Sequence, residues 1–557
     1  MDNRRLILLM IFGFSLVMLW DAWQKYNQPK APATVATQAA SAGTAAPQPT
    51  TNLQAPAAVP NAPVAAPVAT AAAQAGETIT IKTDVYTADI STVGGDITRL
   101  EFNRYTATVD KAKSFALFEP KHRYAAQSGL IGEGLPNHRT VYTVAKGPRE
   151  LPKDGGKDDQ LKVRLEAAGA NGVKLAKTYT FSRGSYQIDV TQEIVNGSGA
   201  AIAPHTYYQF QRDDVHPEGE TAMVSTFTGP AVFTQEEKYQ KLAFDDIAKD
   251  KAKFAKTAEN GWLAMVQHYF VAAWVPQGKD KREFYARKIE GTNGGPTLFA
   301  SGLILPVEQI AAGATGKQSI TLYAGPQEQA TLKKLADGLD LVVDYGWLTV
   351  VAAPIFWVLQ WIHALVGNWG WAIIFLTVLI KAIFYPLSAA SYKSMAKMKV
   401  VAPKLNKLKE TYGDDRARLN QEMMDLYKRE KINPLGGCLP VLIQIPVFIA
   451  LYWVLLGTVE MRYAPFIGYI QDLSAKDPYF ILPIIMGVTM VVQTRLNPPP
   501  PDPIQAKVMM FMPIMFTGMF LFFPAGLVLY WIVNNILSIA QQWQINRAIE
   551  DGGKKAA

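Results

Sequence analysis

Residues 369–387 read WGWAIIFLTVLIKAIFYPL, and this stretch decides the fold class of the chain. It has close to the ~20 apolar residues that a helix needs to cross a bilayer. Four further apolar runs follow it, at 439–459, 479–492, 509–523 and 527–539. Only Pro524-Ala525-Gly526 separates the last two runs, which favours a helical hairpin. The sequence therefore predicts a helical membrane domain over residues 367–545.

Positive charge in the connecting segments predicts how this domain is oriented. One loop holds eleven basic residues: Lys393, Lys397, Lys399, Lys404, Lys407, Lys409, Arg416, Arg418, Lys428, Arg429 and Lys431. Such loops face the cytoplasm. Arg495 and Lys507 mark the next inside loop, and the basic tail 546–557 keeps the C-terminus inside. The same charge could meet acidic lipid or ribosomal RNA, although topology alone would also explain it.

The apolar segment 341–366 is ambiguous, because Pro354, Gln360 and His363 interrupt it and tryptophans recur through it. Tryptophan prefers the membrane interface, so the segment could span the bilayer or lie along its surface. An N-terminal apolar run after Arg4 and Arg5 adds one more helix, within residues 1–27. We interpret this run as a retained anchor rather than a cleaved signal peptide. Six spans with both termini in the cytoplasm then fit the charges, which places 341–366 in the interface.

Between the anchor and the bundle, the sequence predicts a tether and a large β-domain. Residues 28–76 are rich in Ala and Pro and have few large apolar side chains, so they predict a flexible tether. From Glu77 onward apolar and polar residues alternate, as in Thr78–Ile81 and again in Tyr186–Val190, with turn candidates at Gly94-Gly95 and Asn196-Gly197. We expect an antiparallel β-sandwich over about 77–325, followed by a short helix, within a domain bounded by 77–340.

Few features of the sequence point to catalysis. The single cysteine, Cys438, excludes an internal disulfide, and the six histidines are scattered without metal-site spacing. The usual nucleophile, phosphate-loop and zinc-protease motifs are absent, which removes the common signatures of catalysis without excluding it. We predict no enzyme activity, cofactor or metal. Trp262, Tyr269 and Trp274 could form a binding platform, but we favour a role in the β-domain core.

The basic loop itself predicts a helical hairpin at 389–432. Met395, Met398, Leu405 and Leu408 fall at helical spacing, and so do Leu419, Met423 and Leu426, beside Met424. Gly413-Asp414-Asp415 supplies C-cap and N-cap residues between the two helices, and Pro403 predicts a kink. Methionine adapts to varied partners, but we favour the simpler role of packing the hairpin for these methionines.

Lys381 is the most informative single residue, because it lies inside the 369–387 run. At 1.5 Å per residue it is about 10 Å from the cytoplasmic end of that helix. A charge at the bilayer centre costs on the order of 3 kcal/mol. Snorkelling toward the interface is one explanation. A hydrated cavity is the other, and further polar residues within the spans favour it: Thr377, Tyr385, Gln444, Thr517, Asn534 and Asn535. In a continuous helix Thr377 and Tyr385 would share the face of Lys381.

Several specific motifs occur in the chain, namely Asn368-Trp369-Gly370, Tyr385-Pro386-Leu387, Ser394-Met395-Ala396-Lys397-Met398, 433–440 (NPLGGCLP) and 523–530 (FPAGLVLY). These motifs closely resemble those of the YidC/Oxa/Alb family of membrane insertases. Gly261-Trp262-Leu263-Ala264-Met265 resembles the periplasmic domain of the Gram-negative members. The resemblance covers essentially the whole chain.

This resemblance implies a periplasmic β-super-sandwich and an interfacial helix, with five C-terminal spans around a hydrophilic groove open to the cytoplasm. Lys381 matches a basic groove position that is commonly arginine in the family. The substitution keeps the charge but loses the planar fork of arginine. Thr377 matches a substrate-contacting position, and Tyr530 and Trp531 match an aromatic pair on the last helix.

The leading hypothesis is an inner-membrane insertase and chaperone. As the resemblance implies, it would act on nascent membrane proteins in the lipid bilayer, alone or with the Sec translocon, and meet the ribosome and targeting machinery through its cytoplasmic loops. We expect no direct DNA binding. One alternative is a small-molecule transporter with a periplasmic receptor domain, although no internal repeat is found. Another is an envelope enzyme that binds glycan.

Overall fold

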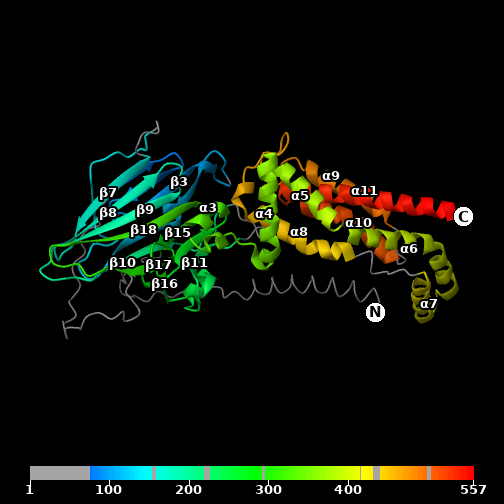
Figure 1. The fold of residues 1–557 in the computed structure, drawn as a ribbon, viewed down its shortest axis with the longest axis horizontal. Coiled ribbons are helices and arrows are strands. Elements are labelled where there is room, and N and C mark those ends of the chain that lie inside the picture. The colour runs from blue at the N-terminus through cyan, green and yellow to red at the C-terminus, as the bar shows by residue number, and fades with distance from the viewer. Residues whose placement is uncertain are drawn as a thin grey trace. The chain divides into compact units, whose positions relative to one another are not determined.

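A computed structural model describes residues 76–556 apart from 109, 153–158, 219–225, 292–294, 414, 431–438 and 498–502. The predicted anchor at 1–27 and all but the last residue of the predicted tether lie outside the described residues. The described chain contains a β-domain, from Thr78 to Pro326, and a set of helices from Thr349 to Ala556 (Figure 1). The expected combination of a large all-β domain with C-terminal helices is confirmed.

Two antiparallel sheets form the β-domain. The first has the order β1 (Thr78–Lys82), β2 (Tyr86–Ser91), β3 (Ile97–Thr106), β5 (Ala125–Ile131), β10 (His205–Arg212), β17 (Leu298–Pro306), β16 (Arg282–Ile289) and β13 (Thr257–Ala258), with β4 (Ser114–Phe118) beside β3. The second has the order β12 (Lys238–Lys241), β11 (Gly229–Thr234), β14 (Trp262–Gln267), β15 (Phe270–Pro276), β18 (Thr315–Pro326), β9 (Gln187–Asn196), β8 (Val173–Ser182), β7 (Gln160–Ala168) and β6 (Thr143–Val144). The predicted sandwich is therefore correct.

The period-two pattern of the strands builds the core between these sheets. In β9, for example, Ile188, Val190 and Ile194 are fully buried and alternate with more exposed residues. Trp262 and Trp274 are also buried, which confirms the core role favoured for them. The predicted Gly94-Gly95 turn follows β2. Both glycines have a positive φ, a backbone conformation that residues with a Cβ rarely adopt.

After the β-domain comes a short helix, α3 (Gln329–Leu335), close to the one expected, and then the helical part of the chain. Its helices are α4 (Thr349–Val366), α5 (Trp369–Ile383), α6 (Tyr385–Tyr412), α7 (Arg416–Arg429), α8 (Leu439–Gly457), α9 (Ile481–Leu496), α10 (Pro503–Phe520) and α11 (Ala525–Ala556). Helix α11 packs against α5, α6 and α9, while α9 also packs against α10. Each apolar run within the described residues therefore forms a helix.

The described helices only partly test the predicted spans. By length and composition, α4 alone is long and apolar enough to cross a membrane, and α5 with the first part of α6 forms a second candidate that is bent by 66°. Gln444–Gly457, Ile481–Leu496 and Ala506–Phe520 are shorter apolar helices. Six spans remain a prediction. So does the interfacial position of α4, whose Trp357 and Trp361 are exposed opposite a buried face.

The bend between α5 and α6 corrects one expectation from the sequence. The apolar run was expected to form one helix to Leu387, but α5 ends at Ile383 and Phe384 caps both helices. Pro386 explains the break. Its backbone nitrogen has no hydrogen to donate to the carbonyl of Ala382 one turn earlier, and its ring clashes with that carbonyl. Tyr385 therefore begins α6 instead of sharing the face of Lys381.

The predicted cytoplasmic hairpin forms from α6 and α7. Asp415 caps α7 by accepting a hydrogen bond from the backbone N–H of Arg418, as expected. Gly413 has right-handed helical angles, so the left-handed C-cap that glycine usually provides is not used. Helix α6 continues through Pro403, and the kink expected there stays a prediction. The hairpin begins at the bend, a few residues before the predicted boundary.

Candidate functional site

Lys381 lies near the C-terminal end of α5, with only 8% of its surface exposed. Its Nζ donates a hydrogen bond to Oγ of Ser538 on α11, at 2.6 Å. The Ser538 hydroxyl in turn donates to the backbone carbonyl of Asn534, one turn earlier on α11, at 2.7 Å. Among the described residues, no carboxylate forms an ion pair with Lys381. The ammonium is therefore held by a neutral hydroxyl.

Helix α11 continues this polar face toward its C-terminal half. Asn535 donates to the Thr489 hydroxyl of α9 at 3.1 Å. Gln541 donates to the carbonyl of Tyr385 at the α5–α6 bend, at 3.2 Å, and Gln542 donates to Asn497 at the end of α9, at 2.9 Å. We call the side chains of Lys381, Asn534, Asn535, Ser538, Gln541 and Gln542 the polar seam. It ties α5, α6 and α9 to α11.

Three residues of the polar seam were missed in the sequence, namely Ser538, Gln541 and Gln542. Their signal is present in the spacing, because Asn534, Ser538 and Gln541 or Gln542 recur every three to four residues along one helix face. The predicted last span ended at Ile539, so the polar residues beyond it were assigned to no membrane helix. Asn534 and Asn535, which the sequence did single out, are both buried within the seam.

Thr377 lies on the buried face of α5 together with Lys381, as expected, whereas Tyr385 belongs to the next helix. Thr377 is fully buried, and its hydroxyl donates to the carbonyl of Ile373 in its own helix at 2.7 Å. Tyr385 lies beyond the bend with 46% of its surface exposed. Gln444 is half-buried on α8. The structure thus links Lys381 through Ser538 to the carbonyl of Asn534, while Asn535 contacts Thr489 of α9.

Tyr530 and Trp531 belong to an aromatic cluster between α8, α10 and α11. The Trp531 ring meets Phe448 edge-on, with 4.8 Å between the ring centroids, and lies 5.6 Å from Phe520. Tyr530 is buried and stacks more loosely on Phe448, at 6.4 Å. The resemblance assigned this pair to the substrate groove, which stays a prediction, and here the pair joins three helices near the α10–α11 turn.

Thr517 serves helix packing. Its hydroxyl donates to the carbonyl of Pro513 in α10 at 2.7 Å, and its side chain lies directly over Gly487 of α9. A Cβ added to Gly487 would lie 2.2 Å from the Thr517 Oγ1, so only glycine lets the two helices approach this closely. Small residues that allow such contact are a common means of joining membrane helices.

Gly487→Val should therefore lower stability, because its side chain must push α9 away from α10. Overpacking of this kind typically costs about 1–3 kcal/mol. The measurement is the thermal unfolding midpoint of the purified protein in detergent. Gly518→Val on α10 is the matched control, because no atom lies within 4 Å of the Cβ position at Gly518. Equal midpoints for the two variants would show that the Gly487 contact does not support the bundle.

The hairpin methionines divide into two groups. Met398 and Met423 pack against a small core of Val401, Leu405, Leu426 and Tyr427, so they hold α6 to α7. Met395 is partly buried. Met424 has 51% of its surface exposed, and Val400 on α6 is also exposed. Packing of the hairpin, the simpler explanation, therefore accounts for Met398 and Met423 but not for Met424.

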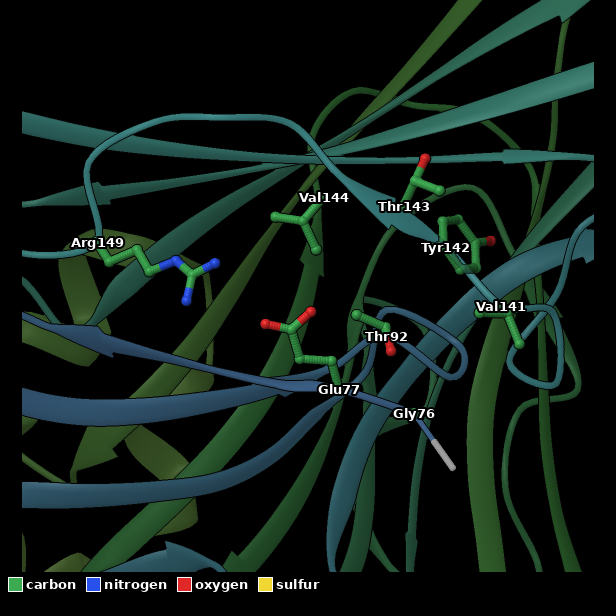
Figure 2. A pocket seen from close by; sticks show the side chains of 8 residues that line it. All are labelled: Gly76, Glu77, Thr92, Val141, Tyr142, Thr143, Val144 and Arg149. Carbon is green, nitrogen blue, oxygen red and sulfur yellow. The ribbon is translucent and has the colours of Figure 1, made fainter. Parts of the chain in front are cut away.

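A hollow of about 570 Å³ lies in the β-domain, and none of the predicted site residues lines it. Figure 2 shows Glu77 and Arg149 on its walls, with Thr92, Tyr142, Thr143 and Val144. These side chains form no cluster of metal ligands, and no such cluster occurs elsewhere in the described chain.

Comparison with known proteins agrees with the division of the chain into a β-domain and a set of C-terminal helices. Residues 78–358 match the YidC periplasmic domain family, and residues 361–552 match the 60Kd inner membrane protein family. The membrane protein insertase YidC of Dechloromonas aromatica is 64% identical over 100% of this chain and 99% of its own length. That of Aromatoleum aromaticum is 60% identical, over 99% and 98% respectively.

Among solved structures, one of an active YidC insertase with its first transmembrane domain resolved covers 83% of this chain and 91% of its own. It is 19% identical with a TM-score of 0.38, so we draw no conclusion from that likeness. The β-domain and the helices together define an inner-membrane protein with a large periplasmic domain. The sequence matches are specific, and the chain belongs to the YidC family of membrane protein insertases.

Membership of this family confirms the resemblance found in the sequence. The insertases are not an enzyme family, which agrees with the absence of catalytic motifs. The transporter and glycan-enzyme alternatives find no support among these relatives.

Proposed function

We propose that this chain inserts and folds newly made inner-membrane proteins, and that the polar seam forms one wall of a groove open to the cytoplasm. The observation that carries the proposal is the buried Lys381 ammonium, which is bonded to a neutral hydroxyl instead of a carboxylate. Burying a charge without a counter-ion is costly in a membrane. A fixed positive charge there can attract acidic residues in the polar tail of a client protein.

The driving force for insertion would come from the client itself. Burial of its apolar span releases roughly 25 cal/mol per Å² without any cofactor. The barrier is the short polar tail that must cross with it, because its backbone and charges lose water in the bilayer. Side chains of the seam, from Lys381 on α5 and from Asn534 to Gln542 on α11, would offer hydrogen bonds to this tail and lower that barrier.

We further propose that the α6–α7 hairpin faces the cytoplasm and meets the ribosome or targeting machinery. Its basic residues and the exposed Val400 and Met424 support this role. In the proposed topology, with the α6–α7 hairpin in the cytoplasm, both termini also lie in the cytoplasm and α4 lies along the periplasmic interface. Larger clients would be handled beside the Sec translocon, and smaller ones by this chain alone.

The test is protease protection of a short single-span client, synthesised in the presence of liposomes that contain only the purified full-length chain. We expect client protection well above that in empty liposomes. If a folded chain gives no gain over empty liposomes, autonomous insertion is wrong. The same liposomes would then be tested for saturable uptake of small solutes, which the transporter alternative predicts.

A further inference from the structure

Ser538 occupies a particular place in the polar seam, because it contacts both Lys381 and its own helix. Only 2% of its surface is exposed, compared with 8% for Lys381. A serine hydroxyl has one proton to donate and two lone pairs to accept with. The proton is directed to the carbonyl of Asn534 at 2.7 Å, so a lone pair is directed at the Lys381 Nζ, at 2.6 Å.

This arrangement fixes the ammonium without neutralising it. The lysine stem has four carbons and could carry its charge toward the interface if nothing held it. A carboxylate at position 538 would hold the charge but would also cancel its attraction for an acidic client. The serine hydroxyl gives the ammonium a short hydrogen bond and leaves its net charge intact.

Helix α11 is well placed to provide such a fixed point. It contacts α5 along its length, and Gln541 and Gln542 tie the same helix to the α5–α6 bend and to the end of α9. Tyr392 of α6 also lies beside Ser538 and is itself buried. The position of the Ser538 hydroxyl is therefore set by three neighbouring helices.

We propose that Ser538 is a positioning residue, which holds the Lys381 ammonium inside the bundle as an uncompensated positive charge for acidic segments of client proteins. The inference rests on the proposed groove function and adds the residue that keeps the charge in place. It also explains how a lysine serves at this position. The lysine ammonium is a point charge on a flexible stem, so a single hydrogen-bonding partner is needed to fix its location. The guanidinium of arginine is planar, and its donors are already fixed relative to one another.

The experiment compares two clients that differ only in their translocated tail, one with acidic residues and one with the corresponding amides. Full-length Ser538→Ala, Ser538→Thr and Lys381→Gln are reconstituted in liposomes, and the initial insertion rate of each client is measured by protease protection. Thr494→Val on α9 is the matched control. The Thr494 hydroxyl also donates to a carbonyl one turn earlier, that of Met490 at 2.8 Å, but it contacts no lysine.

We expect Ser538→Ala to slow insertion of the acidic client by about fivefold, since a hydrogen bond to a charged group is lost. The amide client should be unaffected, and Ser538→Thr should restore the rate because it keeps the hydroxyl. Thr494→Val should match the unmodified chain with both clients. An equal loss for both clients, or a loss that threonine does not restore, would show that Ser538 has only a packing role.

The failure of this inference can be told from the failure of the proposed function. If Lys381→Gln slows the acidic client selectively while Ser538→Ala does not, the groove charge is confirmed and positioning by Ser538 is wrong. If neither variant distinguishes the clients although insertion proceeds, the charge has no attracting role, and the inference fails with it. If the unmodified chain inserts neither client, the proposed function itself is wrong.

Discussion

Lys381→Glu will reduce the insertion of clients with acidic tails by roughly tenfold or more, while Lys381→Arg will stay close to the unmodified chain. At an effective dielectric constant near 20, two unit charges 4 Å apart interact by about 4 kcal/mol, and each 1.4 kcal/mol is a tenfold change. Reversing the charge turns this attraction into repulsion. Arginine keeps the charge and can still donate to Ser538.

The measurement is protease protection of acidic-tailed and neutral-tailed clients in liposomes that contain each variant. The neutral client controls for the folding of the Lys381→Glu chain, because its tail has no charge to be repelled. Equal insertion of acidic-tailed clients by the unmodified chain, Lys381→Arg and Lys381→Glu would rule out attraction by charge. Loss of both clients in Lys381→Glu would indicate a damaged bundle, and the thermal midpoint of that variant would reveal it.

The β-domain was predictable because its signal is local. A strand with one buried face alternates apolar and polar residues, and Ile188, Val190 and Ile194 show this pattern in sequence and in burial alike. What the sequence could not provide is the order of strands in each sheet. Strand β10 pairs with β5 and β17, and these partners lie far from it in sequence. Alternation identifies a strand but not its neighbours.

The helical domain shows the opposite limitation. Apolar runs located the helices, but the run at 369–387 hid a bend, because hydropathy does not register that Pro386 breaks the hydrogen-bond ladder. The sequence therefore placed Tyr385 on the helix face of Lys381, whereas the bend separates the two residues. The partner of Lys381 proved to be Ser538, more than 150 residues later. Such a contact depends on which helices pack together, and a single sequence does not contain that information.

The core of the β-domain holds a second buried lysine, Lys177, which was not noticed in the sequence. It points from the middle of β8 into the sandwich and is fully buried. Its Nζ donates to the carbonyls of Gly94 and Ser128, at 2.6 and 2.7 Å, and lies over the Tyr142 ring at 4.8 Å. Asp96 is buried close by. Burial raises the pKa of the Asp96 carboxyl, and the Lys177 charge opposes that rise.

Lys177→Met should therefore destabilise the β-domain more than any surface change, by about 3 kcal/mol at pH 8, which is typical of removing one member of a buried charged pair. The variant leaves two carbonyls without their donor and the Asp96 carboxylate without its cation. Chemical unfolding of the full-length protein in detergent, followed by tryptophan fluorescence, measures the loss. Lys174→Met is the matched control, because Lys174 lies on the same strand but faces solvent.

The pH dependence separates the lost charge from lost packing. A carboxyl whose folded pKa is raised binds its proton more tightly in the folded state, so its contribution to stability falls as pH rises above the unfolded pKa of about 4. Without Lys177 the pKa of Asp96 should rise further, and the deficit should grow from pH 5 to pH 8. Adding Asp96→Asn to Lys177→Met should remove that growth, because no carboxylate remains to be buried. A deficit that is the same at both pH values, with or without Asp96→Asn, would mean that Lys177 supports the sandwich through its hydrogen bonds and stem alone.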